Sequence, residues 1–235
     1  MTAVTSPIGT EILDQPGCPD QLARTTLRDI GIANALFGGR AAAAWGLDHL
    51  LAGVDATGPL SLLDLGAGSG DIARHLARRA GRHGIRLAPI ALDRHRTAAR
   101  LCRDAALPSV VADAWALPFA ERSVDIVVAS QILHHFTREA GTRLVRALDR
   151  VARVGVIVAD LYRSRTAQAG IWIASWALGF HRVTRADGVT SVRRGFTPAE
   201  LSGLLRSAGI QGEATVARRP GYRVVAAWRA SRAHG

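Results

Sequence analysis

Hydrophobic positions in the middle of the chain form two alternating kinds of run. Short apolar runs predict buried strands, and after most of them apolar residues recur every three or four positions, as on one face of a helix. The expected strands are 60–65, 85–92, 109–112, 124–129 and 154–159. The expected helices between them are 71–82, 138–151 and one that follows the second strand to about residue 105. This alternation predicts a doubly wound α/β fold with a mostly parallel sheet.

Both ends of the chain depart from the strand–helix alternation. Residues 21–52 have helical spacing in two pieces separated by Gly38 and Gly39, which predicts an N-terminal helical cap. Near the other end, 212–217 and 223–228 flank a proline–glycine turn and predict an antiparallel hairpin. We therefore expect a cap over 1–57 and the main domain over 58–235.

Composition limits the class of protein. The chain has 235 residues with 48% hydrophobic residues, enough for one folded domain with a core of its own. Its two cysteines do not suggest a disulfide framework, and no metal-ligand spacing is apparent, so no metal is expected. The first residues lack a basic start and an apolar stretch, so we expect a cytoplasmic protein without a secretory signal. The net charge of +11 comes from arginine alone, which keeps an anionic partner such as RNA as an alternative.

The strongest local signal is the turn Leu-Leu-Asp-Leu-Gly-Ala-Gly-Ser-Gly-Asp over 62–71. Its three glycines, Gly66, Gly68 and Gly70, stand between a strand and a helix, where they let the backbone approach a ligand beside free helix N–H groups. The dinucleotide fingerprint requires its last glycine one position later, where this chain has Asp71. An acid there would repel a pyrophosphate, so a nicotinamide dehydrogenase is disfavoured. A tight turn with an acidic cap is the alternative.

Acidic residues follow the next two strands. Asp93 ends the second strand, where a carboxylate can hold ribose hydroxyls, although it can also cap the next helix. Asp113, after the third strand, can accept a hydrogen bond from an adenine amine, and the Ala114 N–H can donate one. Trp115 is expected beside the adenine ring or, alternatively, in the core.

These motifs resemble those of class I S-adenosylmethionine-dependent methyltransferases, and the stretch 117–130 resembles their type-11 branch. Val124 replaces the phenylalanine usual in that branch. The resemblance implies a Rossmann-like, seven-stranded sheet with a C-terminal antiparallel hairpin, and S-adenosylmethionine as the cofactor. The cofactor-binding residues that it implies are Asp64, Gly66, Ala67, Gly68, Gly70, Asp93, Arg94, Asp113, Ala114, Trp115 and Ser130. The stretch 160–197 also resembles bacterial small-molecule methyltransferases of secondary metabolism.

Two histidines after the fourth strand, His134 and His135, are candidate general bases for an acceptor hydroxyl. An imidazole with its ordinary pKa of about 6.5 accepts a proton near neutrality. The resemblance favours His135, with a purely structural role in the loop as the alternative. Asp160 ends the fifth strand and is expected either to orient a substrate hydroxyl or to pair with Arg163 or Arg165.

An apolar stretch, 167–180, lies within an expected lid insertion of about 161–196 and is too short to span a bilayer. Trp172 and Trp176 share a helical face and are expected to cover a hydrophobic acceptor; core packing, a homodimer contact and membrane-surface docking are alternatives. The other expected substrate-binding residues are Asn34, Phe37, Asp160, His181 and Arg182.

The expected activity is O-methylation of a hydrophobic, phenolic or polyketide-like small molecule. C-methylation of an electron-rich ring uses the same geometry and stays open. An RNA methyltransferase is disfavoured because Ser-Gln-Ile-Leu-His-His, 130–135, lacks the signature of base-amine methylation. A cofactor-binding protein without transfer activity shares every cofactor motif and also stays open.

Overall fold

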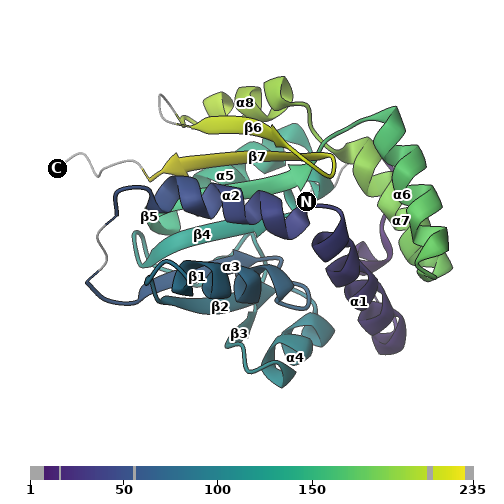
Figure 1. Cartoon of the computed structure of the whole chain (residues 1–235), viewed down its shortest axis with the longest axis horizontal. Coiled ribbons are helices and arrows are strands. Elements are labelled where there is room, and N and C mark those ends of the chain that lie inside the picture. Colours follow the sequence, from purple (N-terminus) through teal and green to yellow (C-terminus); the bar gives the residue numbers. More distant parts are fainter. Residues whose placement is uncertain (1–7, 16, 55–56, 211–213, 231–235) are drawn as a thin grey trace.

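The fold is built on one seven-stranded sheet with the strand order β3-β2-β1-β4-β5-β7-β6 (Figure 1). The computed structural model describes residues 8–15, 17–54, 57–210 and 214–230. The strands are β1 (Leu60–Leu65), β2 (Leu87–Asp93), β3 (Ser109–Val111), β4 (Val124–Ser130), β5 (Ala152–Leu161), β6 (Thr215–Arg219) and β7 (Arg223–Arg229). The first five strands are mutually parallel, whereas β7 pairs antiparallel with both β5 and β6. The predicted α/β class, seven strands and terminal hairpin are confirmed.

Helices cover both faces of this sheet. On one face lie α2 (Gly39–Leu51) and α3 (Asp71–Gly81), and on the other α5 (Arg138–Val151) and α8 (Pro198–Ser207). Neighbouring strand residues alternate between the two cores: Leu62 packs with α2 and α3, and Leu63 packs with α5 and α8. Strands buried on both sides need apolar residues at nearly every position, which explains the continuous apolar runs of the sequence.

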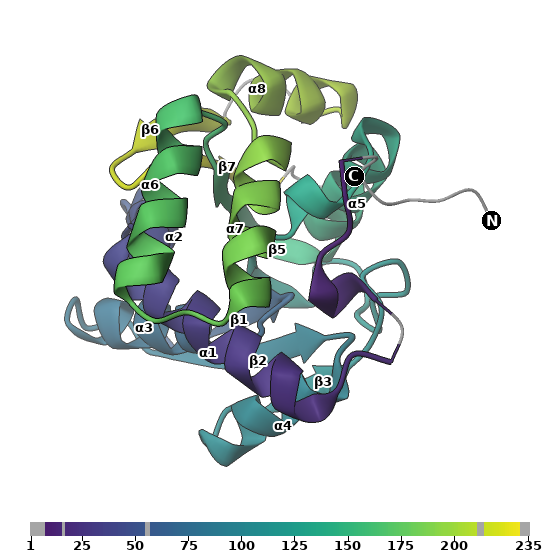
Figure 2. The same ribbon diagram turned by 90° about the vertical axis from the view of Figure 1, so that its right-hand side faces the viewer.

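A helical layer lies beyond the carboxyl ends of the parallel strands. It contains α1 (Asp20–Leu36) and the antiparallel pair α6 (Arg165–Ala177) and α7 (Arg182–Arg194), which stand side by side in Figure 2. The remaining helix α4 (Arg96–Asp104) packs between β2, β3 and α1. A short turn, η1 (Ile12–Asp14), joins this layer, because the Ile12 N–H donates to Asp187 of α7 at 3.1 Å. Of the predicted cap, α1 and η1 lie at this edge, whereas α2 packs on the sheet. The cap over 1–57 stays a prediction.

The structure extends the fifth strand beyond its predicted bounds and adds a helix within the predicted lid. The fifth strand runs over Ala152–Leu161 because its ends pair with β4 and β7. Residues 182–194, expected only as part of the lid, form α7, which begins at a His181 side-chain cap on Val183. Part of the predicted strand 212–217 lies outside the described residues. Within the described part of the chain, no helix combines the length and apolar character needed to cross a bilayer.

Candidate functional site

A cavity of about 650 Å³ lies between the carboxyl ends of the strands and the helical layer. Its floor is formed by the ends of β1, β2 and β4, and its walls by α1, α6 and α7. One end holds the glycine-rich turn and Asp93, and the other holds His134 and His135. Ligands of open α/β sheets bind at this edge. The cavity is therefore the candidate site, and the predicted cofactor and histidine groups meet in it.

The turn after β1 has the backbone that a close-fitting ligand needs. Gly66 and Gly68 have φ values of +68° and +55°, a region that side chains other than glycine rarely adopt. A Cβ on Gly66 would lie 2.7 Å from Ile132, and one on Gly68 would lie 3.2 Å from Leu27. The Gly68 N–H donates to the Asp93 carboxylate at 2.9 Å, which ties the turn to the end of β2. This cradle fits the amino-acid end of a nucleoside cofactor.

The other predicted cofactor residues have distinct places. Asp93 is held by the N–H groups of Gly68 and His95, and burial raises its pKa. Asp113 accepts the Trp115 N–H at 3.0 Å, and Trp115 packs edge-on against Phe136. Among the predicted cofactor set, the residues that line the cavity are Asp64, Gly66, Ala67, Gly68, Asp93, Arg94, Asp113, Ala114, Trp115 and Ser130.

Two residues of that set have other contacts as well. Gly70 lies outside the cavity lining. It is the N-cap of α3 with φ +70°, and a Cβ at this position would collide with the side chain of Leu107. Arg94 donates to the Leu13 carbonyl and to the Asp14 carboxylate, so it binds the N-terminal segment. Asn34 and Phe37 of the predicted acceptor set line the cavity. Asn34 also hydrogen-bonds Asp71 and Gln131, which fixes α1 to the sheet edge.

Asp64 lies fully buried beneath the turn. Burial raises its pKa to about 8, and the neighbouring Asp71 charge adds to the shift, while the Ala73 N–H hydrogen bond opposes it. The folded pKa is above the unfolded value of 3.8, so the folded state holds the proton more tightly. The contribution of Asp64 to stability is therefore greatest below that lower value, and is lost as the pH rises toward 8.

We expect an Asp64→Asn variant to lose this pH dependence, because the amide is neutral at every pH and keeps an oxygen for the Ala73 N–H. Between pH 6 and 8 its free energy of unfolding should fall less steeply than that of the native chain, by roughly 1 kcal/mol per pH unit. Urea unfolding at several pH values measures both slopes. Parallel curves would show that Asp64 is already ionised in the folded protein.

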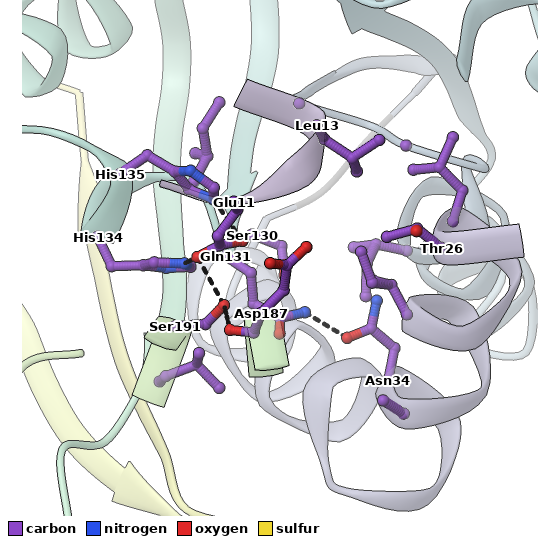
Figure 3. A pocket seen from close by; sticks show the side chains of 18 of the residues that line it. Glu11, Leu13, Thr26, Asn34, Ser130, Gln131, His134, His135, Asp187 and Ser191 are labelled. Carbon is purple, nitrogen blue, oxygen red and sulfur yellow. Dashed lines mark hydrogen bonds and ion pairs between the residues drawn. The ribbon is translucent and has the colours of Figure 1, made fainter. Parts of the chain in front are cut away.

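The histidine end of the cavity is built around two carboxylate–imidazole pairs. His134 and His135 form η2 (Leu133–His135) directly after β4. The Nδ1 atom of His134 lies 2.7 Å from Asp160, and that of His135 lies 2.9 Å from Asp14. Figure 3 shows both rings turned toward Glu11, whose oxygens lie 3.6 Å from His134 Nε2 and 3.7 Å from His135 Nε2.

The pKa values of the groups in and around this cluster are shifted in different directions. Burial alone would lower the pKa of His134, but the charge and hydrogen bond of Asp160, together with Glu11, raise it to about 10. The same contacts hold the pKa of Asp160 below its ordinary value despite complete burial. With its pKa near 10, His134 is protonated near neutrality in the chain without a bound ion. Burial raises the pKa of Asp187, across the cavity, to about 6, with the charges of Glu11 and Asp14 adding to the shift.

Several predicted acceptor contacts are wrong. Asp160 pairs with His134 and not with an arginine, because Arg163 reaches Glu200 instead. Trp172 and Trp176 are 53% and 56% exposed and lie outside the cavity lining. The cavity is lined by the opposite face of α6, including Ile171 and Ser175.

The two residues predicted after the tryptophans also lie outside the lining. His181 caps α7 through its side chain, and its N–H donates to Asp29, while Arg182 is exposed. All four residues lie in α6 or at the start of α7, but helical spacing shows only that residues share a face. It does not show which face the tertiary fold covers.

The N-terminal segment supplies residues that the sequence did not identify. Glu11 accepts hydrogen bonds from Ser191 and Arg194 of α7, and the buried Arg194 also binds the carbonyls of Ile8 and Gly9. Asp14 reaches His135 and Arg94. No spacing links these acids to the histidines, since the pairs lie more than a hundred positions apart.

Comparison with known proteins indicates the same class of protein as the residues of the cavity. Residues 63–159, which begin within β1 and end within β5, match the family model described as a methyltransferase domain. This segment is a methyltransferase domain. The resemblance to class I S-adenosylmethionine-dependent methyltransferases is confirmed, and S-adenosylmethionine is the cofactor of this class. No curated protein sequence matches the chain.

Solved structures share the methyltransferase fold at low sequence identity. Human N-acetylserotonin methyltransferase in complex with S-adenosylmethionine has a TM-score of 0.61 and 12% identity, covering 90% of this chain and 56% of that one. Magnesium protoporphyrin IX methyltransferase from Synechocystis PCC 6803 has a TM-score of 0.54 and 15% identity, covering 83% and 80%. The CurJ carbon methyltransferase has a TM-score of 0.55 and 12% identity, covering 77% and 51%, so this chain spans about half the length of that structure.

Proposed function

We propose that the chain transfers a methyl group from S-adenosylmethionine to a hydroxyl group of a hydrophobic, phenolic or polyketide-like small molecule. One observation carries this proposal: a single cavity joins the glycine cradle to a largely apolar wall and to two histidines. The apolar side chains of the wall come from α1 and its C-cap, from α6, from the turn after α6 and from α7. They are Leu27, Ile30, Leu36, Phe37, Ile171, Phe180 and Val192. A mostly apolar pocket with a few polar groups at one end suits such an acceptor.

Bound S-adenosylmethionine supplies a methyl group that is already activated by its sulfonium. The chain mainly has to hold a nucleophile in line with that methyl group, and such positioning supplies roughly 7–11 kcal/mol in favourable cases. The turn at Gly66–Gly68 and the Asp93 carboxylate hold the cofactor. The apolar wall orients the acceptor, so that its hydroxyl faces the histidine end.

His135 is the proposed proton acceptor. Asp14 lies against Nδ1 and favours the tautomer with the proton there, which leaves the Nε2 lone pair free. The nearest carboxylate oxygen is 3.7 Å from Nε2, beyond hydrogen-bond distance. Nε2 would take the proton of the acceptor hydroxyl, whose oxygen would receive the methyl group that the bound cofactor would supply. His134, charged and buried against Asp160, keeps the loop in place and stabilises negative charge on the acceptor oxygen.

We expect His135→Ala to lower kcat by about 10²–10⁴-fold, the usual contribution of a general base, with the cofactor Kd unchanged. The assay incubates the purified chain with S-adenosylmethionine and a panel of phenolic acceptors, and detects the gain of one methyl group by mass spectrometry. His83→Ala is the matched control, because His83 is exposed and lies away from the cavity. If His135→Ala turned over normally, the base would be another group; if no hydroxyl acceptor were methylated, the proposed function would fail.

A carbon nucleophile is the second candidate. Its support is the structural likeness to the CurJ carbon methyltransferase, and the same cavity geometry would serve an activated ring carbon. The two reactions give different products from one acceptor. The carbon chemical shift of the new methyl group, in NMR of the product, separates an O-methyl from a C-methyl compound.

A further inference from the structure

The two histidines of the cavity are held in the same way. Each ring has a carboxylate on Nδ1, Asp160 for His134 and Asp14 for His135, and each directs Nε2 toward Glu11. Metal-binding histidines share this arrangement: a carboxylate on one ring nitrogen fixes the ring, and the other nitrogen faces the ion. Glu11 completes a group of three whose donor atoms all lie within 4.8 Å of one another.

A buried nitrogen without a hydrogen bond points into this group. His134 is only 3% exposed, and its Nε2 has no hydrogen-bond partner among the described residues. Its distance to Glu11, 3.6 Å, is too long for a hydrogen bond. An unsatisfied buried polar group is costly, by about 1–3 kcal/mol, and a bound ligand removes that cost. The orphaned nitrogen is a second observation, independent of the acidic residues, that indicates a ligand.

The charges around the group also favour a cation. A bound ion would replace the proton of His134, and with both imidazoles neutral Glu11, Asp14 and Asp160 would carry three negative charges. Buried Arg194 offsets one of them, and the half-exposed Arg94 offsets part of another. Buried Arg223 acts on Asp160, whereas the carboxyl group of Asp187 adds to the acidic side. The remaining negative charge is buried, where uncompensated charge is unfavourable. A divalent ion would neutralise it while keeping both histidines uncharged.

We propose that Glu11, His134 and His135 bind a divalent first-row transition metal ion, with Zn²⁺ as the preferred one. Two imidazoles and one carboxylate, with a fourth position left open, form a ligand set that Zn²⁺ takes in enzymes. An ion with bonds of about 2.0–2.2 Å separates adjacent ligand atoms by roughly 3.3–3.6 Å. The two histidine–Glu11 distances, 3.6 and 3.7 Å, are close to this spacing. The open position would face the cavity.

The position of Glu11 in the chain means that a bound ion would connect two distant segments. Glu11 comes from the N-terminal segment, whereas the histidines follow β4, so a bound ion would join the segment to the sheet edge beside the acceptor. Its role in catalysis rests on the proposed function: the ion, in place of His135 Nε2, would meet the acceptor hydroxyl and lower its pKa. Metal binding itself does not depend on methyl transfer, and it is therefore measured without cofactor or acceptor.

The test is a metal titration of the purified full chain after removal of metals with a chelator. Competition between the protein and a chromophoric chelator measures the affinity for Zn²⁺, and the visible spectrum of bound Co²⁺ reports the ligand geometry. We expect one ion per chain and a tetrahedral-type Co²⁺ spectrum. Glu11→Gln and His135→Ala should each weaken Zn²⁺ binding by about 100-fold or more, and Asp14→Asn by about 10–100-fold.

The controls make the result decisive. His83→Ala, at an exposed histidine, should leave the affinity unchanged. Glu11 and His135 are preferred to His134, because His134 forms the buried pair with Asp160 whose loss would destabilise the fold. Circular dichroism checks that each variant is folded. The proposal is overturned if the native chain binds no stoichiometric Zn²⁺, or if Glu11→Gln and His135→Ala retain native affinity. The first result would leave a closed ion-pair cluster with protonated His134, and the proposed methyl transfer would still stand.

Discussion

The Gly68→Val variant is expected to lose at least about 100-fold in affinity for S-adenosylmethionine while the sheet stays folded. Gly68 has φ +55°, where a β-branched residue is strained. Its Cβ would approach Leu27 to 3.2 Å, and the γ-methyl groups would extend into the cavity. A shift of the turn would also weaken the N–H bond to Asp93. A 100-fold loss corresponds to about 2.7 kcal/mol, and isothermal titration calorimetry measures it directly.

Gly84→Val separates backbone strain from obstruction of the site. Gly84 also has a positive φ, +75°, but a Cβ there meets nothing within 4 Å, and the residue lies outside the cavity lining. This control should lose stability through strain and keep its affinity for the cofactor. If Gly68→Val bound S-adenosylmethionine as well as Gly84→Val does, the turn after β1 would not be the cofactor cradle.

The cofactor end could be predicted from sequence because its determinants are local. The strand Leu60–Leu65, the turn and the start of α3 are contiguous in the chain. The apolar run, the glycines and the start of the helix can therefore be recognised one after another in the sequence. Asp93 was predictable because the carboxyl ends of neighbouring parallel strands meet at one edge of the sheet. The expected strands and the helix Arg138–Val151 agree with the structure within a few residues, because their hydrophobic patterns are local as well.

The acceptor end depends on contacts that no local pattern encodes. Glu11 and Asp14 reach the histidines only because the N-terminal segment packs on α7, through Arg194 and the bond from Ile12 to Asp187. For Asp160 the sequence left two roles open, orienting a substrate hydroxyl or pairing with an arginine nearby in the chain. The structure pairs it with His134, because the ends of β4 and β5 are adjacent in the sheet.

Asp160→Ala is expected to destabilise the protein by about 3–5 kcal/mol, the usual effect of removing one partner from a buried ion pair. Asp160 is fully buried and accepts hydrogen bonds from Leu161 N–H at 2.7 Å and His134 N–H at 3.2 Å, besides its contact with the imidazole. Its removal leaves a charged or unsatisfied ring in the interior. The melting temperature should fall by about 6–20 °C, measured by circular dichroism.

Asp48→Ala is the matched comparison, because Asp48 also pairs with a cation, Arg79, but both side chains are well exposed. Removing an exposed ion pair costs at most about 1 kcal/mol, so this variant should melt close to the native chain. A small effect at Asp160 as well would mean that His134 is neutral in the folded protein, and that its ring position is set by packing. A large effect at Asp160 alone would establish that the Asp160–His134 pair anchors η2, and with it the polar end of the cavity, to the sheet.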